Sequence, residues 1–482
     1  MRPAVAWSAV TDDGIGVEVL LVLAAVAAAT VGRGGYYRRV SEVCAVLLAL
    51  AAAVLLGRYR LTTLRLGGWA LAGLGVMVAC TLAAGVLDGH LAAALAPVAL
   101  LTALAVIVAV VAASGVAARR QLTDATLALG VFLATTAWVG VAFRLRPLGH
   151  PDGGLWRAAT TLTYANAAAA ILGALALWAL ARATTRNGWP SRATAVLLLA
   201  GLGATLSRAG LVSFVAGLVV LSALLGFGVV WRAVGMTVIG GLVAAVALAP
   251  GMPVTSEAKP LLAVFGLAAG LVTGVVRRPG VLDRRRSSDS GVRRLRIGGL
   301  ALLAGLAIGV ALVGFSGHAR VWSGRFSLSS PDRASLKSVA LHMWLSHPLS
   351  GVGPGRAAFI WSTAGHELVF DRYAHNEYLQ VAVEQGVVGL VGLAALAAAV
   401  GATAFAGWHS GSRSQRDSGP GADLESLRAG AIAGLVCLAL HSAFDFLWHV
   451  PAVPMIAAIA VGLTARCLQT EQPSQPRTKE IS

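Results

Sequence analysis

The sequence predicts an all-α, polytopic integral membrane protein with about 12–14 transmembrane helices. Its composition and its long apolar runs support that prediction. Of the 482 residues, 57% are hydrophobic and only 12% are charged. Ordinary soluble domains have about 25% charged residues, so a soluble fold of this length would lack the polar side chains to cover its surface. The composition therefore excludes a soluble enzyme, a secreted disulfide scaffold and a disordered chain.

The expected spans follow the apolar runs along the chain. Each run is expected to be helical, because lipid cannot satisfy the hydrogen bonds of an open backbone. The runs lie at about 15–31, 40–56, 66–86, 91–113, 122–143, 160–181, 193–206, 210–230, 233–249, 260–276, 297–315, 387–407, 428–444 and 453–468. They show no repeat of solenoid period and no symmetry between halves of the kind found in transporters.

Basic side chains orient these spans. The net charge is +17, and on a membrane protein such an excess marks cytoplasmic loops rather than a nucleic-acid partner. With both termini cytoplasmic, the inner loops hold Arg58, Arg60, Arg65, Arg119, Arg120, Arg182, Arg186, Arg192, Arg413, Arg416, Arg428 and the basic run 277–296. The cluster Arg33, Arg38 and Arg39 contradicts this orientation. Either one of the first two runs does not cross the membrane, or an outer basic cluster is tolerated.

The same orientation divides the chain into four parts. An N-terminal transmembrane bundle covers 1–315, a long extracytoplasmic loop 316–386, the C-terminal transmembrane helices 387–468, and a disordered cytoplasmic tail 469–482. Loops this long in compact proteins are usually functional. The loop is rich in histidine and basic residues, namely His318, His342, His347, His366, His375, Arg320, Arg325, Arg333, Lys337, Arg356 and Arg372.

The first half of the loop predicts a helix. Ser330 suits an N-cap, and Pro331 suits the first helical position. An apolar stripe with helical spacing follows and runs to the His347-Pro348 pair; it consists of Leu336, Val339, Ala340, Met343 and Trp344. The glycine-rich sequence PLSGVGPG then indicates a tight irregular turn. It follows no predicted strand and contains no GKS/T, which argues against nucleotide binding.

A second helix is expected to begin at His375, in the sequence HNEYLQVAVEQG, and to continue into the span 387–407. At 100° per residue, Glu384 would lie about 180° from His375, so the two could not form a pair on one helix face. The pattern leaves His375 either as a polar residue at the membrane interface or as a functional one. His342 and His347 lack the spacing of metal ligands, which argues against a metal site.

Two further polar positions interrupt the apolar runs. Ser207-Arg208 lies between two of them, where the arginine is either a turn anchor reaching lipid headgroups or a cation that binds an anionic substrate. His441, Asp445 and His449 fall at the outer end of another run. They are either polar groups at a helix end or a wall of a site.

Four segments together resemble the O-antigen ligase and polymerase family, and the resemblance covers roughly residues 195–455. They are SRAG at 207–210, DRASLKSVALHMWLSHPLSGVGPG at 332–355, HNEYLQVAVEQG at 375–386 and HSAFDF at 441–446. The family has a Ser-Arg pair between spans, an arginine about fifteen residues before a Pro-Leu-x-Gly-x-Gly turn, and a His-Asn-x-x-Leu-x-x-x-x-Glu-x-Gly helix. At Ser335-Leu336-Lys337 the sequence departs from the tryptophan of the family's helix, which weakens any expectation of an aromatic lining there.

The resemblance implies a fold similar to the GT-C class of helical membrane glycosyltransferases. It implies transfer of a glycan from an undecaprenyl diphosphate carrier to an acceptor hydroxyl on the extracytoplasmic face of the bacterial cytoplasmic membrane, without a metal or other cofactor. The acceptor could be a glycan, a lipid or a protein. Ligation and polymerisation are not separable from the sequence.

The resemblance also assigns roles to individual residues. The leaving diphosphate needs cations, and guanidinium groups bind phosphate bidentately and stay charged. Arg208 and Arg333 are therefore implied as catalytic cations. His375 is implied as the general base for the acceptor hydroxyl, which makes the 316–386 loop catalytic. Substrate contacts are expected from Arg325, Arg356, Arg372, Asn376 and His441.

Two other classes of protein compete with this interpretation. A transporter or flippase for lipid-linked glycans would need cations near mid-membrane and two pseudo-symmetric halves. Here the cations of interest gather toward one face, which favours an enzyme. A channel or scaffold would leave the 316–386 loop unexplained.

Overall fold

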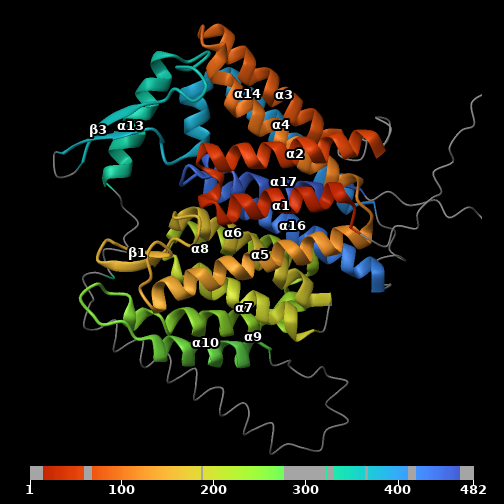
Figure 1. Cartoon of the computed structure of the whole chain (residues 1–482), viewed down its shortest axis with the longest axis vertical. Coiled ribbons are helices and arrows are strands. Elements are labelled where there is room, and N and C mark those ends of the chain that lie inside the picture. Colours follow the sequence, from red (N-terminus) through yellow and green to blue (C-terminus); the bar gives the residue numbers. More distant parts are fainter. Residues whose placement is uncertain are drawn as a thin grey trace, which may run out of the picture.

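The structure is a computed structural model, and it describes residues 15–58, 68–185, 188–275, 322, 331–363, 367–410 and 419–466. Figure 1 shows long helices running side by side, with two short hairpins and helix α13 gathered at one end of the bundle. We call this the loop-bearing end. The predicted span 297–315, the basic run 277–296, Arg325 and the tail 469–482 lie outside the described residues.

The first half of the chain alternates helices with short connections. Its elements are α1 (Val17–Val31), η1 (Arg33–Gly35), α2 (Arg38–Arg58), α3 (Gly68–Leu87), α4 (Leu91–Ala113), α5 (Val116–Ala142), β1 (Gly149–Asp152), β2 (Leu155–Ala158), α6 (Ala165–Thr185), α7 (Trp189–Ala204), α8 (Arg208–Leu225), α9 (Phe227–Val246), η3 (Ala249–Gly251) and α10 (Pro260–Val275). The hairpin β1–β2 is antiparallel and pairs Gly149 with Ala158.

The second half adds α13 (Pro331–Ser346), β3 (Phe359–Ser362), β4 (Leu368–Asp371), α14 (Glu377–Trp408), α16 (Gly419–Ser442), η5 (Leu447–His449) and α17 (Ala452–Thr464). Every predicted apolar run within the described residues corresponds to a helix. Nine of the described helices are long and apolar enough to cross a membrane, and α1, α10 and α17 are shorter apolar helices. The prediction of a polytopic helical membrane protein is confirmed. The two hairpins were not predicted.

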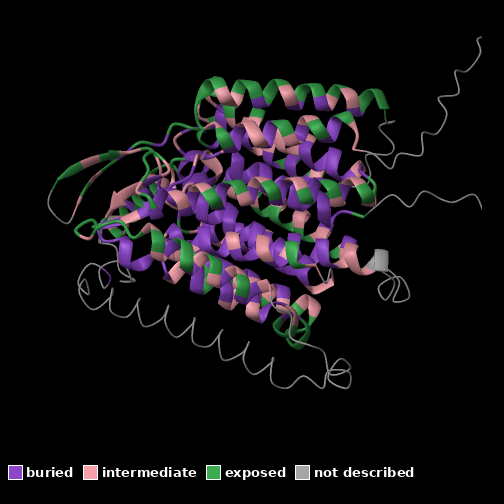
Figure 2. Ribbon diagram, turned by 60° about the horizontal axis from the view of Figure 1, so that its bottom comes forward, coloured by how far each residue is buried: buried purple, intermediate pink, exposed green. Residues whose placement is uncertain are grey.

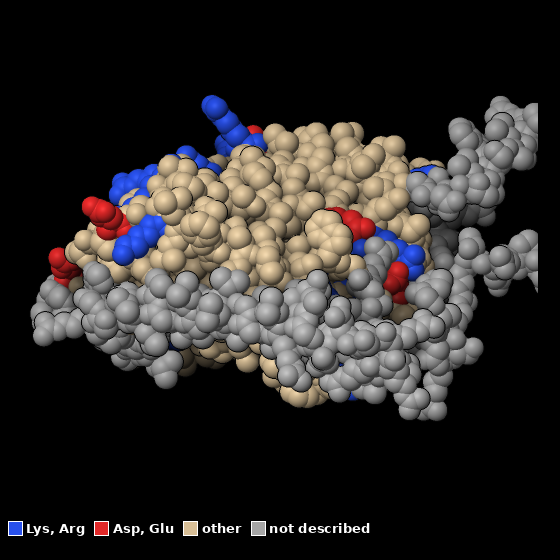
Figure 3. Space-filling view, turned by 90° about the horizontal axis from the view of Figure 1, so that it is seen from below, with Lys and Arg blue, Asp and Glu red and all other residues tan. Residues whose placement is uncertain are grey.

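Burial separates a central helix from peripheral ones. In α6, 94% of the apolar window is buried, and the run Ala167–Ala170 is fully inaccessible. Such small residues let neighbouring helices approach closely. On peripheral α10, by contrast, Leu261 and Phe265 are 74% and 71% exposed, as suits side chains that face lipid. Figure 2 shows the buried interior, and Figure 3 shows a broad uncharged surface, with the charged side chains mainly toward the two ends of the bundle.

Helices α1 and α2 form a packed pair. The connection between them lies at the loop-bearing end, where the Tyr36 and Tyr373 hydroxyls are 3.2 Å apart. At the other end, Arg58 and Glu18 form an ion pair of 3.1 Å. Both of the first two apolar runs are therefore helices, and the Arg33–Arg39 cluster lies at the loop-bearing end.

The predicted stripe of α13 packs against the protein: Leu336 and Ala340 are 1% and 0% exposed, and Val339, Met343 and Trp344 are partly buried. The backbone of the glycine-rich turn that follows packs closely against the backbone of α14. A side chain at Gly351 would collide with the Glu384 backbone, and one at Gly386 with the Leu349 carbonyl. Both glycines also have positive φ, so the turn and the α14 kink at Gly386 need residues without a Cβ.

The start of α14 differs from the prediction. The helix begins at Glu377, and the Asn376 side chain caps it by accepting a hydrogen bond from the Leu379 N–H at 3.0 Å. His375 precedes the cap with a φ of +49°. It is therefore not part of the helix, and the expected rotation of Glu384 relative to His375 rested on a wrong helix start.

Candidate active site

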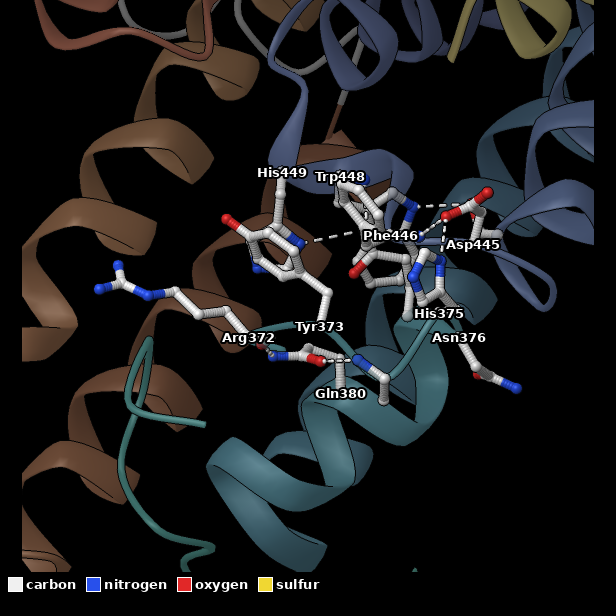
Figure 4. A network of polar contacts seen from close by, with 12 residues as sticks. Arg372, Tyr373, His375, Asn376, Gln380, Asp445, Phe446, Trp448 and His449 are labelled. Atoms are coloured by element: carbon white, nitrogen blue, oxygen red, sulfur yellow. Dashed lines mark hydrogen bonds and ion pairs between the residues drawn. The ribbon is translucent and has the colours of Figure 1, made fainter. Parts of the chain in front are cut away.

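His375 lies at the centre of a polar cluster between the end of α16 and the start of α14, shown in Figure 4. Its Nδ1 is 2.9 Å from Oδ1 of Asp445, and its Nε2 is 3.5 Å from Oδ2 of Asp371. Asp445 is completely buried, and it is 70 residues away from His375 in the sequence. The fold thus provides a carboxylate for each ring nitrogen of His375, with the closer contact at Nδ1.

These contacts fix the charges of both groups. Burial by itself would raise the pKa of Asp445, but hydrogen bonds from His375 and Tyr164 and the charge of His375 lower it to about 2. Burial would likewise lower the pKa of His375, but the hydrogen bonds to Asp371 and Asp445 outweigh it and raise the value to about 9. At neutral pH the resting protein therefore holds an imidazolium beside a carboxylate.

Asp445 has additional partners that hold it in place. The Tyr164 hydroxyl donates to Oδ1 at 2.6 Å, the Asn166 amide donates to Oδ2, and the Phe446 N–H donates at 2.9 Å. Burial and the charge of Asp445 keep the pKa of Tyr164 well above its ordinary value, so the phenol remains a donor. This network fixes the carboxylate that faces His375.

Arg333 of α13 reaches the same carboxylate. Its Nη2 lies 3.8 Å from Oδ2 of Asp445, and its Nη1 donates to the Phe444 carbonyl at 3.1 Å. The guanidinium is partly exposed, with 38% of its side chain accessible. An ion pair this long leaves Arg333 able to turn toward an anionic ligand.

Arg208 is the first residue of α8, after Ser207, whose side chain accepts a hydrogen bond from the Gly210 N–H at 3.2 Å. Among the described atoms, Nη1 of Arg208 is buried and has no hydrogen-bond partner. Arg333 and Arg157 lie close enough to repel its charge. A helix N-terminus and converging guanidiniums together favour a bound anion.

Sequence reasoning missed Arg157. It lies on β2, is only 7% exposed, and donates to the Thr205 carbonyl at 2.9 Å, just before Arg208. It also pairs with Asp152 and contacts Asn166. Arg157 thereby joins the turn that holds Arg208 to the network around Asp445. The sequence signal was an arginine and an aspartate in a short connection between apolar runs.

Aromatic rings beside the cluster were also missed. Phe446 stacks between Tyr164 and Tyr373, with ring centroids 4.9 Å and 4.4 Å away, and its ring lies 5.0 Å from that of His375. His375 therefore has an aromatic ring beside it as well as the two carboxylates.

The structure separates the other predicted substrate contacts. His441 is fully buried, both its ring nitrogens lack partners among the described atoms, and it lies near enough to sense the charges of Asp445 and Arg333. Arg356 instead pairs with Asp88 of the α3–α4 connection at 3.5 Å. Arg372 is exposed and extends away from His375 in Figure 4, and Asn376 caps α14. The described residues contain no group of three His, Cys, Asp or Glu side chains that could hold a metal.

The helical bundle and this cluster define a polytopic membrane protein with a histidine–aspartate pair and converging arginines at one end. Residues 247–394 match the family model described as O-antigen ligase. The matched stretch contains Arg333 and His375, whereas Arg208 and Asp445 lie outside it. No curated protein matches the chain. The family supports a role in membrane glycan transfer or ligation.

Proposed function

We propose that the protein transfers a glycan from an undecaprenyl diphosphate carrier to an acceptor hydroxyl on the extracytoplasmic face of the bacterial cytoplasmic membrane. The observation that carries this proposal is the placement of His375 against the buried Asp445 carboxylate, beside Arg333 and Arg208. In a chain that matches the O-antigen ligase family model, this arrangement supplies one acid–base group and two cations for a diphosphate. The grouping of these cations at one end of the bundle favours an enzyme over a transporter or flippase.

In this mechanism the arginines act on the donor. As the acceptor oxygen bonds to the anomeric carbon, the bond between that carbon and the diphosphate breaks, and the electron pair leaves with the diphosphate. Arg208 and Arg333 stabilise the growing negative charge, because guanidinium groups bind phosphate bidentately. The unpartnered Nη1 of Arg208 and the long Arg333–Asp445 ion pair leave both groups available for that contact.

His375 acts on the acceptor. Asp445 accepts a hydrogen bond from Nδ1–H and fixes the ring, so Nε2 can take the proton of the acceptor hydroxyl once the acceptor displaces the weaker Asp371 contact. The imidazolium that forms is the state stabilised by both carboxylates. The proton already on His375 must leave first, so transfer should be faster at higher pH.

The test is an assay with the purified protein in liposomes, a carrier-linked glycan and a hydroxyl acceptor. Wild-type protein should release undecaprenyl diphosphate in step with formation of the linked product. His375→Ala and His375→Gln should both lower transfer per inserted molecule by about 10²- to 10⁴-fold, because neither can accept the proton. Near-normal turnover in His375→Gln would show that His375 is not the general base. Absence of any transfer by the wild type would reject the proposed function.

A further inference from the structure

The backbone at His375 has an unfavourable conformation. Its φ of +49° lies in the left-handed region, which residues with a Cβ rarely adopt. Such a conformation persists only where surrounding contacts hold it, and it is common at functional sites. The contacts that hold this turn therefore bear on the orientation of the imidazole ring.

Gln380 makes two of these contacts from the first turn of α14. Its Oε1 accepts a hydrogen bond from the Ala374 N–H at 2.8 Å, and its Nε2 donates to the Arg372 carbonyl at 3.1 Å. The side chain is only 2% exposed. One side-chain amide thus forms hydrogen bonds with the backbone of two of the residues just before His375, as Figure 4 shows.

Glu384 fixes the orientation of that amide. Its Oε1 accepts from Nε2 of Gln380 at 2.7 Å, and its Oε2 accepts from the Gly355 N–H at 2.8 Å. A carboxylate can only accept hydrogen bonds, so the amino group of Gln380 must face Glu384 and its oxygen must face Ala374. The glycine-rich turn therefore fixes the Glu384 carboxylate through the Gly355 N–H, and this carboxylate in turn fixes the Gln380 amide.

We propose that Gln380 and Glu384 are positioning residues that hold His375 in its reacting orientation: Gln380 clamps the backbone of residues 372–374, and Glu384 locks the Gln380 amide. This inference rests on the proposed function of His375. It assigns a role to the glutamate of the HNEYLQVAVEQG sequence that does not require contact with the substrate.

The donor and acceptor pattern makes Glu384→Gln an informative change. Gln380 and Gly355 donate to different oxygens of Glu384, and a glutamine has an oxygen at only one of these two positions and an amino group at the other. The variant retains nearly the same side-chain volume and loses one of the two hydrogen bonds, so it should loosen the clamp without creating a cavity.

A neighbouring glutamine provides a matched control. Gln385 lies on the same helix, is 5% exposed, and accepts a hydrogen bond from Thr81 of α3 at 3.0 Å. It makes no hydrogen bond to residues 372–374 among the described contacts. Gln385→Met and Gln380→Met therefore each remove a buried amide from α14, but only the second opens the clamp.

The experiment uses the full-length protein in liposomes and measures kcat, donor KM and the pKa of His375, followed by NMR of labelled histidines and assigned with His375→Gln. Measured well above the His375 pKa of about 9, where the imidazole is deprotonated in the wild type and in the variants, Gln380→Met and Glu384→Gln should lower kcat about tenfold to a hundredfold, with a donor KM that changes by less than about twofold. The pKa of His375 should fall from about 9 toward its ordinary value of about 6.5. Gln385→Met should change none of the three quantities.

The groups that face His375, namely Asp371, Asp445 and Arg333, are unchanged in these variants. Gln380→Met also changes no ionisable group, so a pKa shift in this variant reports movement of the ring. Unchanged kcat and pKa in Gln380→Met would show that Gln380 does not position His375, and the proposed function would be unaffected. If Gln380→Met does not reach the membrane, the same measurements on Glu384→Gln decide the question. A wild type that transfers nothing would reject the proposed function, and the pKa measurement would still decide whether the clamp positions His375.

Discussion

Arg119 and Arg208, at opposite ends of the bundle, hold their guanidinium groups in different ways. At the end opposite the loops, Arg119 is fully buried, and its guanidinium donates to the Ser114, Ala465 and Ala112 carbonyls at 3.0, 2.7 and 2.8 Å. At the loop-bearing end, Arg208 has a buried nitrogen with no partner among the described atoms, and Arg333 has one hydrogen bond, to the Phe444 carbonyl at 3.1 Å, and a long ion pair of 3.8 Å. A guanidinium whose nitrogens all have hydrogen-bond partners holds helices together, whereas one with an unpartnered or weakly paired nitrogen can bind a ligand.

Among the changes that test this comparison, arginine-to-lysine changes at the two ends should have the largest effects. Arg333→Lys and Arg208→Lys keep the charge but lose the planar fork, so kcat/KM should fall about tenfold to a hundredfold, with normal amounts of protein in the membrane. Arg119→Lys should lower the amount or thermal stability of the protein, because some buried carbonyls lose their donor. Its transfer per inserted molecule should remain near the wild-type value.

This comparison is checked by measuring transfer and membrane content together for all three variants. A wild-type kcat/KM in Arg333→Lys would show that Arg333 does not bind the diphosphate. Arg119→Lys could instead lose as much turnover per molecule as Arg333→Lys. That result would show that the number of hydrogen bonds an arginine makes does not separate a structural role from a role in transfer.

The next effects concern pH and Asp371. With a His375 pKa of about 9, roughly one molecule in a hundred has a free base at pH 7. The kcat/KM value should therefore rise about tenfold per pH unit below that pKa. Asp371→Asn removes a carboxylate that favours the imidazolium, so the pKa should fall and turnover at pH 7 should increase severalfold.

The control for this change is Glu367→Gln, which alters an exposed carboxylate on the same hairpin connection and should leave the pH profile unchanged. A profile that is flat between pH 6.5 and 9 in the wild type would argue against proton transfer to His375 in the rate-determining step.

The sidedness of the two ends can be checked without any effect on turnover. In a background lacking Cys44, Cys80, Cys437 and Cys467, single cysteines replace two exposed serines, Ser362 at the loop-bearing end and Ser410 after α14. An impermeant maleimide applied to intact cells should label Ser362→Cys and not Ser410→Cys. The reverse pattern would place the candidate site on the cytoplasmic face and contradict the proposed orientation.

The sequence by itself determined the helical bundle and several parts of the site. Each span is encoded locally, because an apolar run in lipid has no alternative to a helix. The stripe that begins at Leu336 predicted the buried face of α13 for the same local reason. Arg208, Arg333 and His375 came from the family's motifs, and the structure brings these three residues into one cluster.

Only the tertiary structure decided how that cluster works. Asp445 and Asn166 contact each other across 279 residues, and no local pattern states which buried carboxylate meets His375. The sequence also predicted that the second helix begins at His375. In the folded chain the Asn376 cap and the Gln380–Glu384 pair hold His375 outside the helix. Buried polar groups must find partners wherever the fold provides them, so their pairing depends on packing over long sequence distances.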